Sequence, residues 1–319
     1  MAEPLFDRVA IIGVGLIGSS IARAARKAGL ARTIAAADQD AFVRERVVAL
    51  GLADEVFERS GEAAAEADLV IVCTPVGVCG PVAAEIGPRL KPGAILSDVG
   101  SVKGAVVRDM APHVPAHAHF VPAHPIAGTE DSGPDAGFAE LFDGRWAILT
   151  PLESTDPAAV AALRAFWEGA GARVDTMTVE HHDLVFAIVS HVPHLIAYNI
   201  VGTAADLEEV TQSEVIKYSA SGFRDFTRIA ASDPTMWRDV FLNNRDAVLQ
   251  MLGRFVEDLT ALQRAIRWGE GDKLFELFTR TREIRRSIIE QGQDTAAPDF
   301  GRRNAPSAGD HGAISPPGP

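Results

Sequence analysis

The segment HPIAGTE at residues 124–130 places an ionisable imidazole directly before a proline, where neither a helix nor a good strand is favoured. Pro125 biases His124 toward extended backbone angles, and Pro122 removes one amide and fixes another φ angle. Gly128 permits a turn that other residues resist. We expect an ordered loop that presents His124 at a defined place, where a neutral imidazole near its normal pKa can draw off a proton at pH 7. A surface loop with an idle histidine is the alternative.

Candidate anion-binding groups lie in the segment GFRDFTRIAASDPTMWRD at residues 222–239. Arg224, Arg228 and Arg238 fall within this short span, separated by aromatic and small residues rather than set in a run of solvated charges. Arginine is the side chain best suited to bind a carboxylate through two hydrogen bonds. We therefore expect a substrate role for at least one of them, with ordinary surface ion pairing as the alternative.

The candidate phosphate-binding motif is GVGLIG at residues 13–18, which directly follows a short apolar run. An expected helix that ends near Gly29 and a second strand that ends at Asp38 come next. Strand, glycine turn, helix, strand and acid in this order are typical of a dinucleotide site. Asp38 should bind the adenosine ribose and repel a 2′-phosphate, which favours NAD over NADP, although Arg32 and Arg44 lie nearby in the sequence. The expected cofactor contacts of the turn are Gly13, Gly15, Leu16, Ile17 and Gly18.

The rest of the first half alternates short apolar strands with helices, which indicates a mostly parallel sheet with helices on both faces. Strands are expected at residues 8–12, 33–37, 69–73, 94–99, 119–121, 147–150 and 173–176. Ligands of such sheets bind beyond the carboxyl ends of the strands. The loops at 74–78, 97–104 and 123–130 should therefore line one crevice with the glycine turn, and His124 should face the nicotinamide end of the cofactor. Further cofactor contacts are expected from Thr74, Pro75, Val76 and Gly100.

From about Val179 the pattern changes to long helices, the first over 180–206, which Pro193 should kink. Ser232-Asp233-Pro234 indicates a helix start, and a last helix is expected at about 272–289. These helices are too apolar for one thin layer, so we expect them to pair with a second copy of the chain. The predicted fold class is an α/β Rossmann-type doubly wound parallel sheet followed by an all-α dimerisation domain. The predicted domains are 1–178 for dinucleotide binding, 179–290 for substrate and dimerisation, and a disordered tail at 291–319.

Composition narrows the classes of partner. The 319 residues carry a net charge of −13, which argues against nucleic acid or an anionic membrane as the main partner. Only Cys73 and Cys79 are present, so neither a disulfide framework nor a zinc cluster is expected, and a reducing cytoplasm fits best. The acidic N-terminus does not resemble a signal peptide, and no apolar run is judged long enough to span a bilayer.

Some of the nine histidines are spaced as candidate metal ligands. His113, His117 and His119 precede His124, but no acidic or cysteine residue lies at a supporting spacing, so no metal is expected. His181 and His182 open a helix and are interpreted as exposed. His191 and His194 share one helical face beside Pro193. They are either satisfied core residues, or one of them faces the crevice and holds the polar tail of a substrate.

The sequence resembles the prephenate and arogenate (cyclohexadienyl) dehydrogenase family. The motifs that carry the resemblance span most of residues 8–290: GVGLIG, CTPV at 73–76, SDVGSVKG at 97–104, HPIAGTE, SHVPH at 190–194 and the segment 222–239. The resemblance implies an NAD-dependent oxidoreductase of tyrosine biosynthesis. Such an enzyme oxidises the ring 4-hydroxyl of prephenate, of arogenate or of both, while the ring carboxylate leaves as CO2. The choice between these small-molecule substrates stays open.

The resemblance also implies roles for individual residues. His124 polarises or deprotonates the 4-hydroxyl, Ser101 hydrogen-bonds the same region, and Arg228 binds a substrate carboxylate. His194 lies near the substrate side chain. Further substrate contacts are expected from His191, Thr129, Glu130 and Arg224, the last of which stands where some relatives have lysine.

Two alternative functions were weighed against this one. A β-hydroxyacid dehydrogenase built on the same frame relies on a catalytic lysine in its helical domain, and Lys217 is the only candidate near the right region. A non-catalytic NAD sensor would keep the frame and lose its chemistry, against which the intact His124, Ser101 and Arg228 speak. Formation of NADH on addition of prephenate separates these alternatives.

Overall fold

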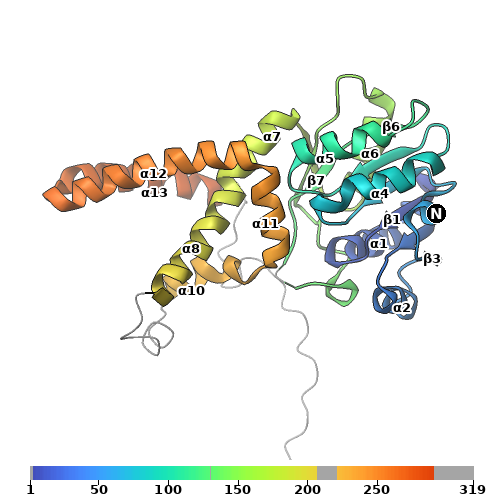
Figure 1. The fold of residues 1–319 in the computed structure, drawn as a ribbon, viewed down its shortest axis with the longest axis horizontal. Coiled ribbons are helices and arrows are strands. Elements are labelled where there is room, and N and C mark those ends of the chain that lie inside the picture. Colours follow the sequence, from blue (N-terminus) through green and yellow to red (C-terminus); the bar gives the residue numbers. More distant parts are fainter. Residues whose placement is uncertain (1–2, 130, 207–220, 291–319) are drawn as a thin grey trace, which may run out of the picture. The chain divides into compact units, whose positions relative to one another are not determined.

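The computed structural model describes residues 3–129, 131–206 and 221–290 (Figure 1). It divides into two compact units, Met1–Gly253 and Arg254–Pro319, each considered separately below. Three sequence-based predictions concern residues outside the described ranges: the substrate contact of Glu130, the alternative lysine Lys217 and the disordered tail at 291–319.

A six-stranded parallel sheet forms the centre of the first unit. Its strands are β1 (Phe6–Ile12), β2 (Ala31–Ala37), β3 (Glu55–Phe57), β4 (Leu69–Val72), β5 (Ile95–Asp98) and β6 (His119–Phe120). They lie in the order β3-β2-β1-β4-β5-β6, which is that of a doubly wound sheet and confirms the predicted fold class. The three-residue strand β3 was not expected, because only Val56 and Phe57 in it are even partly buried and apolar.

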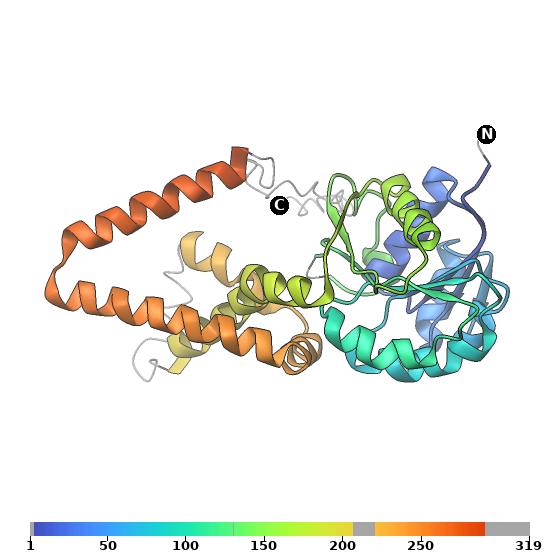
Figure 2. The same ribbon diagram turned by 90° about the horizontal axis from the view of Figure 1, so that it is seen from above.

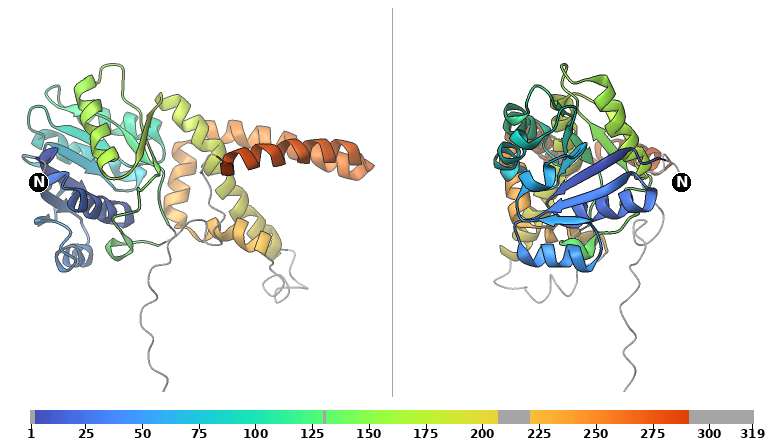
Figure 3. Two further views of the ribbon diagram at one scale, coloured as in Figure 1. Left: turned by 180° about the vertical axis from the view of Figure 1, so that it is seen from behind. Right: turned by 90° about the vertical axis from the view of Figure 1, so that its right-hand side faces the viewer.

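Helices cover both faces of this sheet (Figure 3). They are α1 (Leu16–Ala28), α2 (Ala41–Ala49), α3 (Ser60–Ala64), α4 (Cys79–Ile86), α5 (Lys103–Met110) and α6 (Pro157–Gly169). Alternate residues of a strand point to opposite faces, so Val9 and Ile11 of β1 enter one core while Ala10 and Ile12 enter the other. The nearly unbroken apolar character of β1 therefore reflects burial on both sides.

A second, three-stranded sheet holds His124. Strands β7 (Ala123–Pro125) and β8 (Trp146–Leu149) pair antiparallel, and β8 pairs parallel with β9 (Arg173–Thr176). The expectation that the last two strands continue the first sheet is thus wrong, as is that of a loop at His124, which pairs with Ile148. Pro122 has no amide to extend the β6 ladder, so the chain leaves the first sheet there. The extended angles that Pro125 favours then suit a short strand.

From Val179 onward, the described part of the first unit is mainly helical. They are α7 (Val179–Phe186), a π-helical segment (Ala187–His191), α8 (Val192–Asp206), α10 (Ser221–Thr227), a 3₁₀ turn (Arg228–Ala231), α11 (Pro234–Asn243) and the start of α12 (Arg245–Trp268). The distortion expected at Pro193 takes the form of the wide π turn just before it, where the Val192 amide donates to the Ala187 carbonyl. The predicted start of α11 is confirmed, because Asp233 caps it by accepting from the Met236 amide at 2.7 Å.

The stretch Val179–Asp206 is long and apolar enough, by length and composition alone, to cross a membrane. The expectation that no run has this property is therefore wrong. Core helices of globular proteins pass the same test, and this stretch contains the buried polar residues His182 and His191. Helix α11 also packs against the parallel-sheet region, where Trp237 and Val240 share a core with Val76 and Cys79.

The second unit consists of the rest of α12 and of α13 (Gly271–Glu290), two long helices joined at Gly269 (Figure 2). Gly269 takes a positive φ of 66°, which only glycine adopts freely. The helix predicted at 272–289 is confirmed. Large apolar side chains are exposed on this pair of helices: Val256, Leu259, Ile266, Trp268, Phe275, Phe278, Ile284, Ile288 and Ile289.

Candidate active site

The glycine turn between β1 and α1 has the shape that a dinucleotide needs. A Cβ on Gly18 would lie 2.1 Å from the Gly13 carbonyl oxygen, so helix and turn pack too closely for any side chain there. Gly15 precedes α1 without a capping side chain, and no heavy atom of the described residues lies within 4 Å of the Cβ it lacks. The first amides of α1 and the space beside Gly15 therefore suit a pyrophosphate.

Asp38 lies at the carboxyl end of β2 beside this turn. Its carboxylate accepts hydrogen bonds from the amides of Val14 at 2.9 Å and Asp40 at 3.0 Å. Arg44 donates to the carbonyl oxygens of Asp38 and Gln39, each at 2.9 Å, so one of the two nearby arginines adjoins the ribose position. The other, Arg32, pairs with Asp7 at the opposite end of β2. The acid at this position fits an adenosine ribose.

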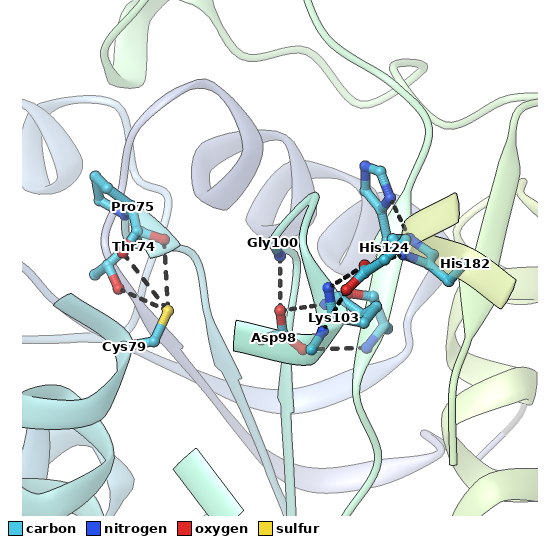
Figure 4. Close-up of polar contacts among 11 residues, drawn as sticks. Thr74, Pro75, Cys79, Asp98, Gly100, Lys103, His124 and His182 are labelled. Atoms are coloured by element: carbon cyan, nitrogen blue, oxygen red, sulfur yellow. Dashed lines mark hydrogen bonds and ion pairs between the residues drawn. The ribbon is translucent and has the colours of Figure 1, made fainter. Parts of the chain in front are cut away.

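The turns that follow β1, β4 and β5 pack against one another. A Cβ on Gly13 would lie 3.0 Å from both the carbonyl oxygen of Cys73 and the Cγ2 atom of Thr74. A Cβ on Gly100 would lie 3.1 Å from the Cγ2 atom of Val76. The structure thus brings predicted cofactor residues of three loops together, and Figure 4 shows Thr74, Pro75 and Gly100 among them. Leu16 and Ile17 open helix α1 at the same turn.

A buried ion pair holds the β5 turn to the strand of His124. Lys103 and Asp98 are both fully buried, and Lys103 Nζ donates to the Asp98 carboxylate and to the Ala123 carbonyl oxygen (Figure 4). Asp98 also accepts from the amides of Gly100 at 2.7 Å and Ala123 at 3.2 Å. Ser101, which is half-buried, lies in the turn fixed in this way. Sequence reasoning missed this pair, although a charged residue ending an apolar strand was visible.

His124 is the first of three linked side chains. Its Nδ1 atom lies 2.8 Å from Nε2 of His182, and Nδ1 of His182 lies 2.9 Å from the carboxylate of Asp183 (Figure 4 shows the histidine pair). Asp183 also accepts from the amides of Lys103 and Gly104, each at 2.8 Å. His182 is therefore completely buried, and its interpretation as an exposed residue is wrong. His181 beside it is exposed.

The surroundings of His124 favour the neutral imidazole. Burial, and then the charges of His182, Lys103 and His191, hold the pKa of His124 well below its usual value. The expectation of a normal pKa is thus wrong, because the ring packs against Phe186 with centroids 4.7 Å apart. The residue His124 as a whole is nevertheless only partly buried. An imidazole that is neutral at pH 7 can act as a base.

The pKa values of the two linked groups are set by opposing causes. Burial lowers the pKa of His182, while the hydrogen bond to Asp183 raises it, and the net direction is down. Burial alone would raise the pKa of Asp183, but hydrogen bonds from His182, Gly104 and Lys103 bring it below its usual value. At neutral pH the pair is therefore a neutral imidazole and an ionised carboxylate.

His191 presents a buried hydrogen-bond donor. Its Nδ1 atom lies 3.1 Å from Nδ2 of Asn244, which can only donate, so Nδ1 is the acceptor and the ring proton is on Nε2. In the described part of the chain, Nε2 has no hydrogen-bond partner although the side chain is fully buried. Burial lowers the pKa of His191 to about 4, so the ring is neutral at pH 7 and its N–H is available to an acceptor.

Ring contacts connect His191 with Trp237 and His194, and an electrostatic effect connects His194 with Arg228. Trp237 lies with its ring 6.1 Å from His191 and is stacked on His194 at 3.7 Å. Burial lowers the pKa of His194, while its hydrogen bond to the Ser190 carbonyl raises it. The positive charge of Arg228 lowers the pKa further, and the net direction is down. Because His191 in turn affects the pKa of His124, these residues occupy one continuous region of the first unit.

The remaining predicted substrate residues are less enclosed. Arg224 is exposed on α10, and Thr129 is half-buried and accepts a hydrogen bond from the Asp131 amide at 3.2 Å. Arg238 makes a surface ion pair with Asp239, as the alternative interpretation of the arginines had it. Within the described ranges, no group of three His, Cys, Asp or Glu residues is placed to hold a metal ion. Cys73 and Cys79 are free thiols.

Two family models together match most of the chain. The model described as "Prephenate dehydrogenase, nucleotide-binding domain" matches residues 21–176. The model described as "Prephenate dehydrogenase, dimerization domain" matches residues 178–280. The order of the two matches is that of the parallel sheet and the helices that follow it.

Curated relatives and solved structures point the same way. A cyclohexadienyl dehydrogenase of Zymomonas mobilis is 44% identical over 284 residues, which is 89% of this chain and 97% of the relative. A prephenate dehydrogenase of Bacillus subtilis is 32% identical over 280 residues, 88% of this chain and 75% of the relative. The structure of A. aeolicus prephenate dehydrogenase in complex with hydroxyphenyl propionate and NAD+ superposes with a TM-score of 0.82 at 35% identity, covering 88% of this chain and 98% of the other. Synechocystis arogenate dehydrogenase gives a TM-score of 0.75 at 28% identity, covering 88% and 99%.

Proposed function

This chain belongs to the prephenate dehydrogenase family, and from that premise we propose how its residues carry out the reaction. The protein is an NAD-dependent oxidoreductase of tyrosine biosynthesis that acts on prephenate, arogenate or both. It oxidises the ring 4-hydroxyl with loss of the ring carboxylate as CO2. The product is 4-hydroxyphenylpyruvate from prephenate and tyrosine from arogenate. The observation that carries the residue assignments is the neutral, partly buried His124, whose strand is hydrogen-bonded to Lys103 and Asp98 at the turn after β5.

The glycine turn and Asp38 bind the cofactor. The amides at the start of α1 would hold the pyrophosphate beside Gly15, and Asp38 would accept hydrogen bonds from the ribose hydroxyls. The loop residues Thr74, Pro75, Val76 and Gly100 line the path toward the nicotinamide, together with Leu16 and Ile17 of the turn. Bound NAD supplies the hydride acceptor, and the residues below orient the substrate toward it.

His124 acts as the base and Ser101 orients the hydroxyl. His124 accepts the proton of the 4-hydroxyl as the hydride leaves the carbon that bears it. The bond between the ring and its carboxylate then breaks, its electron pair enters the ring, and CO2 departs. The product keeps a phenolic hydroxyl, so the proton that His124 received returns to the same oxygen. The half-buried Ser101 lies in a turn fixed by Asp98, which suits it to hold that oxygen in place.

The helical residues bind the anionic parts of the substrate. Arg228 pairs with a carboxylate in a chain whose overall charge is −13. His191 donates its buried Nε2–H to the polar tail, which would give that donor the partner it lacks among the described residues. His194, stacked on Trp237, lies beside the same tail. We assign peripheral contacts to Thr129, Glu130 and Arg224.

Substitution of His124 tests the assignment of the base. His124→Asn should leave NAD binding unchanged and reduce turnover by about 10²–10⁴-fold, because general base catalysis contributes about that much. The matched control is His181→Asn at an exposed histidine of α7, which should keep full activity. Near-normal turnover in His124→Asn would reject the role. Wild-type NADH formation with prephenate and with arogenate, measured in parallel, tests the reaction itself and separates the dehydrogenase from a silent NAD sensor.

The helical region also pairs two copies of the chain. We place the boundary between nucleotide-binding and dimerisation domains at 178/179. The exposed apolar side chains of α12 and α13 supply the contact with the second copy. Phe275 is 73% exposed, and Phe275→Glu should shift the dimer toward monomer in light scattering, whereas Glu276→Lys on the same helix should not. A wild-type protein that is monomeric at micromolar concentration would contradict the assembly.

We place the enzyme in the cytoplasm, because its two cysteines are free thiols and its acidic surface does not favour anionic membranes. Cell fractionation tests this, and recovery in the membrane fraction would contradict it.

A further inference from the structure

We propose that His182 and Asp183 form a proton relay with His124, in which His124 passes its Nδ1 proton to His182 as it receives the substrate proton on Nε2. The inference rests on the proposed function, since it concerns how the base of that reaction handles its proton. The sequence suggested a catalytic role for neither residue, and both lie on α7 at the junction with the helical region.

The hydrogen bonds fix which nitrogen carries each proton. The carboxylate of Asp183 already accepts two amide hydrogens, from Lys103 and Gly104, and an ionised carboxylate can only accept. His182 must therefore donate through Nδ1, which leaves its Nε2 as an acceptor. His124 then donates through Nδ1 across 2.8 Å, so its own lone pair is on Nε2. That is the nitrogen a base needs free for the substrate.

The charges around the two rings show where a positive charge is best held. Facing His124 are His182 on α7, Lys103 on α5 and His191 on the π segment, none of which stabilises a cation. Facing His182 are the carboxylates of Asp183 and Asp98 as well as Lys103. Burial lowers the pKa of both rings, but only His182 has a carboxylate in direct contact. A cation therefore costs less on His182 than on His124.

The proton movements balance without any further reactant. The substrate O–H bond breaks and an N–H bond forms at Nε2 of His124. The Nδ1–H bond of His124 breaks and an N–H bond forms at Nε2 of His182, so the imidazolium that results is His182, paired with Asp183. Both transfers reverse when the phenolic oxygen of the product takes its proton back. The relay thus stores one proton between the two halves of the reaction.

Hydrogen bonds from two backbone amides hold the Asp183 carboxylate in place. They connect it to the first turn of α5, the helix that begins at Lys103 just after Ser101. His182 is held between this anchor and His124, with its ring 4.4 Å from that of Phe186. His182 and Asp183 are positioning residues, because they act on the substrate only through His124.

The test replaces the proton carrier and keeps the hydrogen-bond acceptor. His182→Gln offers an amide oxygen to the His124 Nδ1–H but cannot take up a proton. It should reduce kcat by about 10- to 100-fold, at or below the lower end of the range for general base catalysis because His124 itself is retained, with KM for prephenate and Kd for NAD within about twofold of wild type. The acid limb of kcat/KM should also move to lower pH. In this variant the proton stays on His124, whose ring is less basic than that of His182. Burial is the larger cause of the low pKa of His124, and it persists after the repulsion from His182 is gone. His181→Gln serves as the matched control.

A purely structural role would lower kcat equally at every pH and leave the acid limb in place, and that result would overturn the relay. So would wild-type kcat in His182→Gln. If His182→Gln fails to fold, Asp183→Asn gives the second test, since it removes the charge that favours His182 as the cation and should lower kcat without raising KM. Wild-type activity in Asp183→Asn would also overturn the relay. Failure of the relay differs from failure of the proposed function, which would appear as absent NADH formation in the wild-type enzyme.

Discussion

Lys103 and Asp98 form an ion pair from which solvent is fully excluded, and the same lysine binds the carbonyl oxygen of the residue before His124. The Lys103–Asp98 pair thus fixes the strand that carries His124, the base of the proposed reaction. Loss of one partner would leave a buried charge unpaired, which is far more costly than loss of a surface pair.

Lys103→Met should lower the free energy of unfolding by about 3–5 kcal/mol, because Asp98 would remain buried without its cation. Lys27→Ala is the control. Its pair with Glu140 is about half exposed, and such pairs contribute about 0–1 kcal/mol. Urea unfolding monitored by tryptophan fluorescence measures both variants. Equal losses in the two would show that the buried pair has no special weight.

Gly15→Ala and Gly18→Ala should separate binding from folding. The added methyl of Gly15→Ala meets no described atom of the protein, so stability should be unchanged while Kd for NAD rises by about 10-fold or more as the methyl fills the phosphate space. The methyl of Gly18→Ala would overlap the Gly13 carbonyl at 2.1 Å, so stability itself should fall. Fluorescence titration with NAD and urea unfolding provide the two readouts. Unchanged NAD affinity in Gly15→Ala would place the phosphates elsewhere.

Asp38→Ala should weaken NAD binding and improve that of NADP, because the carboxylate that repels a 2′-phosphate is gone and Arg44 is adjacent. The double variant Asp38→Ala/Arg44→Ala should lose the gain for NADP, which isolates the contribution of the guanidinium. Steady-state kcat/KM with each cofactor checks this. A ratio that does not move would mean that Asp38 does not contact the ribose.

Arg228→Ala should chiefly raise KM for prephenate, since Arg228 is half-buried and loss of a charged contact costs up to about 2–5 kcal/mol where the contact is enclosed. Arg224→Ala should have a smaller effect because its side chain is exposed, and Arg238→Ala, which breaks only a surface pair with Asp239, should have none. Initial-rate kinetics at saturating NAD measure all three. An unchanged KM in Arg228→Ala would rule it out as the anchor.

Stability should fall as the pH drops below about 6.5, because His191 is held neutral by burial. Its pKa is about 4 in the folded protein and near 6.5 in the unfolded chain, so the unfolded state binds more protons between these values. The stability that depends on the neutral ring is thus fully present above pH 6.5. About 3 kcal/mol of the free energy of unfolding is lost by pH 4. The free energy of unfolding, measured in urea at pH 7.5, 6 and 5, should depend less steeply on pH in His191→Asn than in the wild type. An identical slope would assign the effect to other groups.

The parts of the fold that depend on neighbours in sequence could be predicted. The glycine turn, Asp38 and the caps of α11 follow from short-range geometry, and each lies where the spacing placed it. The second sheet could not, because nothing local tells β8 that its partner is the three-residue β7 rather than β6. Pro122 was the available sign that the first sheet ends there.

The linked side chains of the site escaped prediction for the same reason. His124 and His182 are 58 residues apart in the chain, and Asp183 accepts a hydrogen bond from the Gly104 amide of α5 across 79 residues. Adjacent ionisable residues at the start of an apolar helix were visible, yet exposure is the commoner state of such residues. Only the folded arrangement shows that burial has turned His182 from a surface group into a partner of the base.

The π turn at Ala187–His191 has a consequence for rotational phase. Successive residues of an α-helix rotate by about 100°, so residues nine apart, such as His182 and His191, would point in opposite directions. The wide turn absorbs about one residue, which swings His191 back toward the side of His182, in accord with the electrostatic effect of His182 on its pKa. If residues 187–191 formed an ordinary α-helix instead, the second half of the stretch would be rotated by about 100° relative to the first. In the proposed site, the π turn is thus what lets one continuous helical stretch carry both the partner of His124 and the residues assigned to the polar tail of the substrate.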